Sequence, residues 1–188
     1  CRRDAGGATR GRLAAVIGLD AARSLEVCVQ AEVELADVNC PGQIVISGEV
    51  AKIDHACELA RAAGAKKAMP LAVAGAYPSR LMVSAQPKLR DAMARLTFGS
   101  PQVLALSNVT AAPHGAPDEI RERLVEQVTA PVRWEAGVRY LLARGFTRFI
   151  ELGPGRTLTG FLKRIDRQAQ GLNVADVPSL QETVRALG

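Results

Sequence analysis

The order of hydrophobic patterns over residues 12–73 restricts the fold of this chain more than any other feature. Four short apolar runs, alternating or rich in β-branched residues, predict strands over 12–18, 33–38, 44–46 and 66–73. Apolar residues at three- and four-residue steps predict two helices between these strands. The apolar face of the first helix, expected to be buried, contains Ala22, Leu25 and Val29. The apolar face of the second contains Val50, Ile53, Cys57 and Ala60. This β-α-β-β-α-β order predicts a ferredoxin-like unit.

After Gly75 the pattern changes to longer helices separated by isolated strands. Helical periodicity predicts helices over 82–96, 117–128, 132–144, 158–165 and 179–187. The apolar runs between them predict strands over 103–107, 149–152 and 173–177. Such alternation is typical of a parallel sheet covered by helices. We therefore expect a disordered or vestigial tail at 1–11, a ferredoxin-like subdomain at 12–75 and an α/β part at 76–188.

Composition excludes several classes of protein. The chain is 48% hydrophobic and 23% charged, as in soluble globular proteins, and its one Trp, two Tyr and four Phe favour a layered α/β core over an aromatic-rich barrel. The net charge is +5. Much of the excess comes from four arginines within the Gly-rich residues 1–12, so it is poor support for nucleic-acid binding.

The cysteines and histidines give no metal-binding pattern. Cys1, Cys28, Cys40 and Cys57 show no CxxC spacing, and neither His55 nor His114 extends them to a zinc motif. Free thiols in a reducing cytoplasm are the simplest interpretation. The sequence contains neither a signal peptide nor an apolar run of about 18 residues, so we expect a cytoplasmic protein without a membrane span.

Three further features have a structural and a functional interpretation. Cys40 beside a turn is expected to be a small packing residue rather than a nucleophile, because a reactive cysteine needs a group that lowers its pKa. Gly153-Pro154-Gly155 is expected to be a tight strand-to-helix turn rather than a phosphate loop. Lys163 and Arg164 are either a solvated helix end or an anion-facing pair.

Four blocks of sequence are informative beyond their local structure. They are Leu13-Ala-Ala-Val-Ile-Gly-Leu19, Val38-Asn-Cys-Pro-Gly-Gln-Ile-Val-Ile-Ser-Gly48, Gln127 with Pro131-Val-Arg-Trp134, and Glu151-Leu-Gly-Pro-Gly-Arg-Thr-Leu-Thr-Gly160 with Lys163-Arg164. These blocks resemble the malonyl-CoA:acyl-carrier-protein transacylases, a family of acyltransferases. The order and spacing of the blocks also fit the family from about residue 12 to the end. Together they are far more specific than the GPG turn alone.

The resemblance implies an α/β-hydrolase-like core with an inserted ferredoxin-like subdomain, so that 76–188 is the C-terminal half of that core. It also implies a Ser–His mechanism without a cofactor. In this mechanism a serine on a nucleophile elbow takes malonyl from malonyl-CoA and passes it to acyl carrier protein. An arginine holds the free malonyl carboxylate.

The chain departs from the family pattern at the catalytic positions. No G-x-S-x-G elbow occurs, and only Arg2 or Arg3 lies near the expected place of the arginine. The segment 75–82 places Pro78 at the general-base histidine and Tyr77 at a phenylalanine of the acyl pocket. Gln127 matches the glutamine whose carbonyl orients that histidine, and Asn39, in the second block, is expected to contact substrate. Proline cannot accept a proton from a serine.

We therefore expect a truncated transacylase that is inactive alone and needs a companion carrying the N-terminal half, or that self-associates. The alternative is a non-catalytic module that binds acyl carrier protein. An RNA-binding module shares the β-α-β-β-α-β order but needs aromatic residues on its central strands. Residues 13–18 and 43–47 contain none, which argues against that class.

Overall fold

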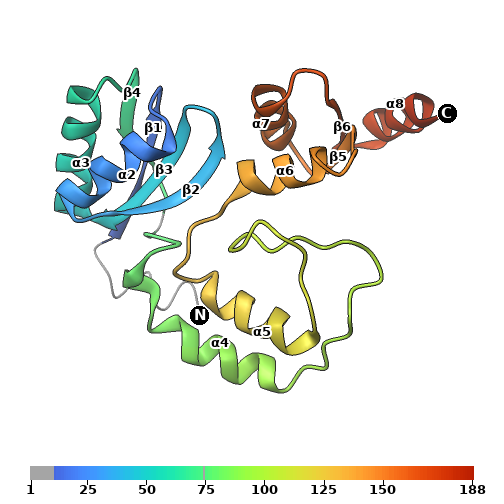
Figure 1. The fold of residues 1–188 in the computed structure, drawn as a ribbon, viewed down its shortest axis with the longest axis horizontal. Helices are drawn as coiled ribbons and strands as arrows, with labels where there is room; N and C mark the ends of the chain where they lie inside the picture. The colour runs from blue at the N-terminus through green and yellow to red at the C-terminus, as the bar shows by residue number, and fades with distance from the viewer. Residues whose placement is uncertain (1–10, 74) are drawn as a thin grey trace. The chain divides into compact units, whose positions relative to one another are not determined.

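The computed structural model describes residues 11–73 and 75–188, which fall into two compact units (Figure 1). The first extends to Gly137 and the second is Val138–Gly188. The boundary predicted at residue 75 lies inside the first unit, and a subdivision there stays a prediction. Among the described helices, none is long and apolar enough to cross a membrane. Arg2 and Arg3 lie outside the described residues.

One antiparallel sheet organises the start of the first unit. It contains β1 (Gly11–Ile17), β2 (Glu34–Cys40), β3 (Gln43–Glu49) and β4 (Lys67–Pro70), in the order β2-β3-β1-β4. Ala14 of β1 lies opposite Ile46 of β3 on one side and Pro70 of β4 on the other. The pairing of β2 with β3 is irregular at Ala36 and at Asn39. All four predicted strands therefore belong to a single sheet.

Helices α2 (Ala21–Ala31) and α3 (Val50–Ala62) cover one face of this sheet (Figure 1). Asp20 caps α2, because its carboxylate accepts a hydrogen bond from Arg23 N at 2.8 Å. The buried face predicted for α2 is wrong: Leu25 and Val29 are 51% and 72% exposed. The helix instead buries Ser24, Val27, Cys28 and Ala31. The buried face of α3 contains Ile53, Cys57 and Ala60, as predicted.

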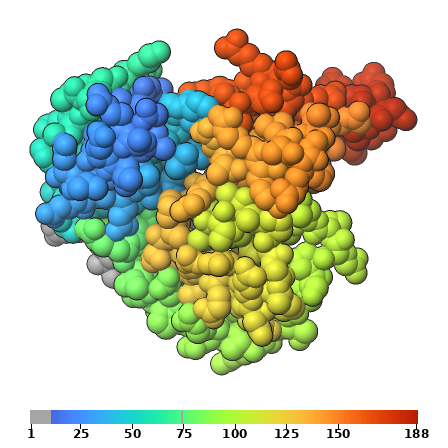
Figure 2. All heavy atoms as spheres, in the orientation of Figure 1, coloured from blue at the N-terminus to red at the C-terminus, as the bar shows by residue number. Residues whose placement is uncertain are grey.

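Two helices form the next layer of the first unit, after the short 3-10 turn η1 (Arg80–Met82). Helices α4 (Ala85–Ala94) and α5 (Pro117–Glu126) lie side by side, and with the loop that joins them they form a continuous surface (Figures 1 and 2). The Gln86 amide donates to the Val125 carbonyl at 3.2 Å and to Thr129 Oγ1 at 3.1 Å. The strand predicted at 103–107 is wrong: that stretch makes only one isolated bridge, between Leu106 and Pro113. No strand within the described residues pairs with it to form a ladder.

Helix α6 (Trp134–Leu142) leads into the second unit, which contains a two-stranded parallel sheet. Strand β5 (Arg148–Leu152) pairs with β6 (Gln170–Val174), with Ile150 opposite Leu172. The last strand was predicted slightly later, over 173–177. Helices α7 (Thr157–Ile165) and α8 (Val177–Leu187) both pack on β6. A Cβ built on Gly171 would lie 2.7 Å from the Thr159 side chain, so α7 approaches the strand closely there.

Candidate active site

The segment 75–82 lies on the face of the sheet away from α2 and α3, which we call the second face. Because side chains alternate along a strand, Val45 and Ser47 point to this face while Ile44 and Ile46 point to the helices. The buried Ser47 hydroxyl donates a hydrogen bond of 2.6 Å to the Pro78 carbonyl. Arg80 adds a 3.2 Å ion pair with Glu34 of β2. These contacts hold the Tyr77-Pro78 dipeptide against the sheet.

The third block of the resemblance lies along the free edge of β2. Val38 N donates to the Val132 carbonyl at 2.9 Å, and Val132 N donates to the Ala36 carbonyl at 2.8 Å. This pair of bonds forms a parallel bridge between Asp37 and Val132. The second and third blocks of the resemblance, far apart in sequence, are therefore in direct main-chain contact.

A small hydrophobic cluster joins these two regions. Met82 and Ala85 are buried at its centre, and Tyr77 and Val128 pack against them. Tyr77 and Val128 therefore pack against the same two buried residues, and Pro78 and Gln127 are their neighbours in the chain. Gln127 ends helix α5, and its N–H donates to the Arg123 carbonyl at 2.9 Å.

We call the group formed by Asp37, Ser47, Tyr77, Pro78 and Gln127 the second-face site. Asn39 follows on the same strand, at the second irregularity of β2, and is half-buried. Of the site residues predicted from the sequence, Pro78 is bonded to the second face and Asn39 lies on the edge strand β2. Tyr77 and Gln127 are linked to them through the Met82 cluster and the end of α5. Pro78 contributes a carbonyl oxygen that already accepts a hydrogen bond and has no titratable group.

Asp37 and Ser47 are the members of this site that sequence reasoning missed, and Asp37 is the one that can titrate. It lies opposite Val45 in the β2–β3 pairing and next to the bridge with Val132. Burial raises the pKa of its carboxyl from 3.8 to about 6. The available signal was a carboxylate flanked by apolar Ala36 and Val38 within a predicted strand. The site thus contains a group that titrates near neutral pH.

The other residues considered from the sequence do not join this site. Cys40 is fully buried, as expected for a packing residue. His55 is exposed on α3, 3.9 Å from Glu58. His114 follows the Leu106–Pro113 bridge in a loop, where its main-chain N–H donates to the Ala105 carbonyl. Within 11–73 and 75–188, no group of three His, Cys, Asp or Glu side chains could hold a metal ion.

The fourth block of the resemblance has a structural function at the start of α7. The Glu151 carboxylate accepts hydrogen bonds from Leu158 N at 3.0 Å and from Thr159 N at 2.8 Å, which places it on the otherwise unpaired N–H groups of the first turn. Burial acts to raise the pKa of Glu151, but hydrogen bonds from the Thr159 hydroxyl and the main-chain N–H groups of 157–159 hold it below its ordinary value of 4.5. Glu151 therefore caps α7 from the preceding strand.

We expect Glu151→Ala to weaken α7. Loss of a helix cap costs about 0.5–2 kcal/mol, so the free energy of opening that hydrogen exchange reports for the α7 amides should fall by about that amount at pH 7. Because the folded-state pKa is depressed, the contribution is present above pH 4.5 and is lost as the pH falls through the folded-state value. Glu182→Ala, which removes an exposed carboxylate from α8, serves as the control. Equal protection in the two variants would contradict the capping role.

Comparison with known proteins identifies the class to which this fold and site belong. Residues 7–186 match the acyl transferase domain model, and the chain is a member of that family. Curated relatives carry the name malonyl CoA-acyl carrier protein transacylase. The protein of Bacillus subtilis is 38% identical over 185 residues, covering 96% of this chain and 58% of the relative. That of Escherichia coli K12 is 40% identical over 159 residues, covering 82% and 52%.

Solved structures of proteins with this activity in their names superpose closely on this chain. The malonyl-CoA:acyl carrier protein transacylase of Xanthomonas oryzae superposes with a TM-score of 0.92 at 38% identity, covering 98% of this chain and 60% of its own. A malonyl-transacylase in complex with a type II PKS acyl-carrier protein superposes with a TM-score of 0.91 at 35% identity, covering 94% and 59%. The resemblance found in the sequence is therefore confirmed. The chain spans somewhat more than half the length of these relatives.

Proposed function

We propose that this chain is the C-terminal part of an acyltransferase that moves malonyl from malonyl-CoA to acyl carrier protein. The observation that carries the proposal is the convergence of the 75–82 and 127–134 segments on one sheet, in a chain that belongs to this family. Acyl carrier protein as the acceptor is supported by the names of the relatives and by the solved complex.

In this proposal the second-face site is one wall of the acyl pocket. Tyr77 takes the position of the family phenylalanine, Asn39 contacts substrate, and the Gln127 carbonyl occupies the place from which a histidine would be oriented. Pro78 takes the position of that histidine and supplies no base. The antiparallel order β2-β3-β1-β4 supports a ferredoxin-like subdomain over 12–75, with 76–188 as the C-terminal half of a hydrolase-like core.

We also propose that a companion segment or a second copy covers part of the second unit. Several of its large apolar side chains are more than 40% exposed: Ile150, Leu152, Val177, Leu180, Val184 and Leu187. Four of them recur on α8 at steps of three and four residues, which makes one apolar stripe along the helix. Exposed apolar surfaces of this kind are typical of interaction sites.

The purified chain is expected to transfer no malonyl. After incubation with radiolabelled malonyl-CoA and acyl carrier protein, we expect no labelled carrier and no mass increase of the chain, since neither an elbow serine nor a base at position 78 is present in it. The Bacillus subtilis relative, assayed in parallel, is the positive control. A covalent malonyl adduct on the chain, at Cys40 or Ser79 for example, would overturn this expectation.

A further inference from the structure

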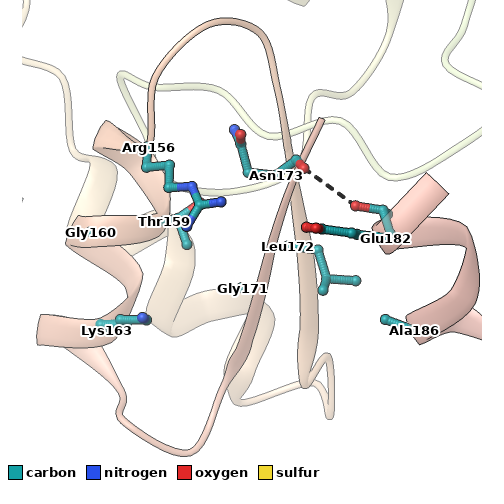
Figure 3. A pocket seen from close by; sticks show the side chains of 10 residues that line it. Arg156, Thr159, Gly160, Lys163, Gly171, Leu172, Asn173, Glu182 and Ala186 are labelled. Carbon is teal, nitrogen blue, oxygen red and sulfur yellow. Dashed lines mark hydrogen bonds between the residues drawn. The ribbon is translucent and has the colours of Figure 1, made fainter. Parts of the chain in front are cut away.

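A cleft in the second unit lies outside the second-face site. It has a volume of about 360 Å³ and opens between α7 and α8 above strand β6 (Figure 3). Its lining includes Arg156, Gly160 and Lys163 on the α7 side, Gly171 and Asn173 on β6, and Glu182 on α8. Gly160 and Lys163 belong to the fourth block of the resemblance, and the proposed acyl transfer assigns them no role.

The floor of the cleft is held in place by hydrogen bonds. The Asn173 amide donates to the Gly155 carbonyl at 2.8 Å and to the Glu151 carbonyl at 3.3 Å. The buried Thr183 hydroxyl of α8 donates to the Asn173 carbonyl at 3.3 Å. These bonds connect β6 to the turn before α7 and to α8. Both walls are thus fixed to the same strand.

The room in the cleft comes from residues without bulky side chains. A Cβ built on Gly160 would meet nothing within 4 Å, although Gly160 lies inside helix α7. Glycine is unfavourable in a helix interior because it lacks a side chain and adds backbone freedom. Helix α7 therefore contains a residue of low helix propensity at the point where any side chain would enter the cleft.

Opposite charges face the cleft from its two walls. Arg156, the residue before α7, and Lys163 on α7 extend toward β6, whereas Glu182 extends toward β6 from α8 (Figure 3). Among the described residues, none forms an ion pair with either of the two cations. Asp176 is close enough for the Arg156 charge to contribute to a lowering of its pKa, but the larger cause is the hydrogen bonds from Ser179. Its carboxylate caps α8, so the cations remain available to a ligand.

The charge pattern indicates what such a ligand would be. The first-turn N–H groups of α7 are occupied by Glu151, so an anion must be bound by side chains rather than by the helix terminus. Two cations match a phosphate group, whose charge at neutral pH approaches −2. The Glu182 carboxylate on the opposite wall repels an anion and favours an ammonium group.

We propose that this cleft binds a small phosphate monoester that also carries an ammonium group, with the phosphate facing Arg156 and Lys163 and the ammonium facing Glu182. The site is independent of the proposed acyl transfer. The cleft volume of about 360 Å³ lies near the lower end of the range of about 300–1,000 Å³ for pockets that bind drug-sized ligands. The cleft therefore suits a ligand of few heavy atoms.

O-phosphoethanolamine is the probe, titrated into the full ¹⁵N-labelled chain at constant ionic strength and followed by amide chemical shifts. We expect saturable shifts confined to 156–163, 171–173 and 182–186. Inorganic phosphate should bind at the same amides but several-fold more weakly, and ethanolamine alone should give no saturable shift. Shifts that saturate elsewhere, or an absence of saturable shifts with phosphoethanolamine, would overturn the proposal.

Variants distinguish binding of the probe in the cleft from nonspecific electrostatic attraction to the chain. Gly160→Leu fills the cleft and improves helix propensity, so we expect an intact fold with binding weakened by about tenfold or more. Arg156→Gln and Lys163→Gln should each weaken binding, and Glu182→Gln should remove the preference for phosphoethanolamine over phosphate. Arg167→Gln, an exposed arginine that does not line the cleft, is the control and should bind as the unmodified chain does. Unchanged affinity in Gly160→Leu, with the α7 amides still protected from exchange, would exclude the cleft as the binding site.

Discussion

A fusion that carries Pro78→His is expected to transfer malonyl at least about a thousandfold faster than the same fusion with Pro78. The fusion joins this chain to the part of the Bacillus subtilis relative that the chain does not cover, in which the family resemblance implies the nucleophile segment. Loss of one member of a catalytic triad costs several orders of magnitude in rate, because the nucleophile is no longer deprotonated as it attacks. The Ser47 bond to residue 78 uses a main-chain carbonyl, so the substitution does not remove it.

Pro78→Ala in the same fusion is the matched control. Alanine frees the backbone from the proline ring but adds no titratable group, so this variant should stay as inactive as the Pro78 fusion. The rate of labelled malonyl transfer to acyl carrier protein is the measurement. Equal activity of the proline and histidine fusions would show that position 78 is not the base position. Inactivity of the histidine fusion, with the fusion folded, would contradict the proposed acyl transfer.

The second large effect is expected at Asp37. Its carboxyl has a pKa of about 6 in the folded chain against 3.8 ordinarily, because burial disfavours the charged form. The folded state therefore binds the proton more tightly than the unfolded state. As the pH rises from 3.8 through 6, the free energy of unfolding should fall by up to about 3 kcal/mol and then level off.

Asp37→Asn removes this charge while keeping the shape of the side chain. We expect it to raise the free energy of unfolding of the first unit by up to about 3 kcal/mol at pH 8 and to leave it nearly unchanged at about pH 3.5. Urea unfolding at a series of pH values checks this. Asp91→Asn, at an exposed position of α4, should show no such pH-dependent gain. A uniform effect of Asp37→Asn at all pH values would point to packing rather than to titration.

The type and order of most helices and strands can be predicted from the sequence alone. Local signals predicted them: the Cys40-Pro41-Gly42 turn, the β-branched run 44–46 and the Asp20 cap. Each of these signals acts on residues nearby in the chain, so it can be recognised without a structure. The family was equally accessible, because four blocks in order are specific without any structure. Gln127 and Asn39 were selected because they lie in those blocks, and Tyr77 and Pro78 because segment 75–82 corresponds to the family's histidine motif. No local physical property selected any of the four.

Which helix faces are buried and which distant segments come into contact is visible only in the folded chain. Helix α2 carries two apolar stripes, and contact with the sheet selects Val27 and Cys28 over Leu25 and Val29. Residues 103–107 have a strand-like composition, but none of the strands that the structure describes pairs with them. Asp37 acquires its raised pKa from packing around β2, and Tyr77 meets Val128 through the cluster at Met82. Periodicity records what each residue prefers locally. Burial and pairing depend on segments far away in the chain, which share no local pattern that would reveal them.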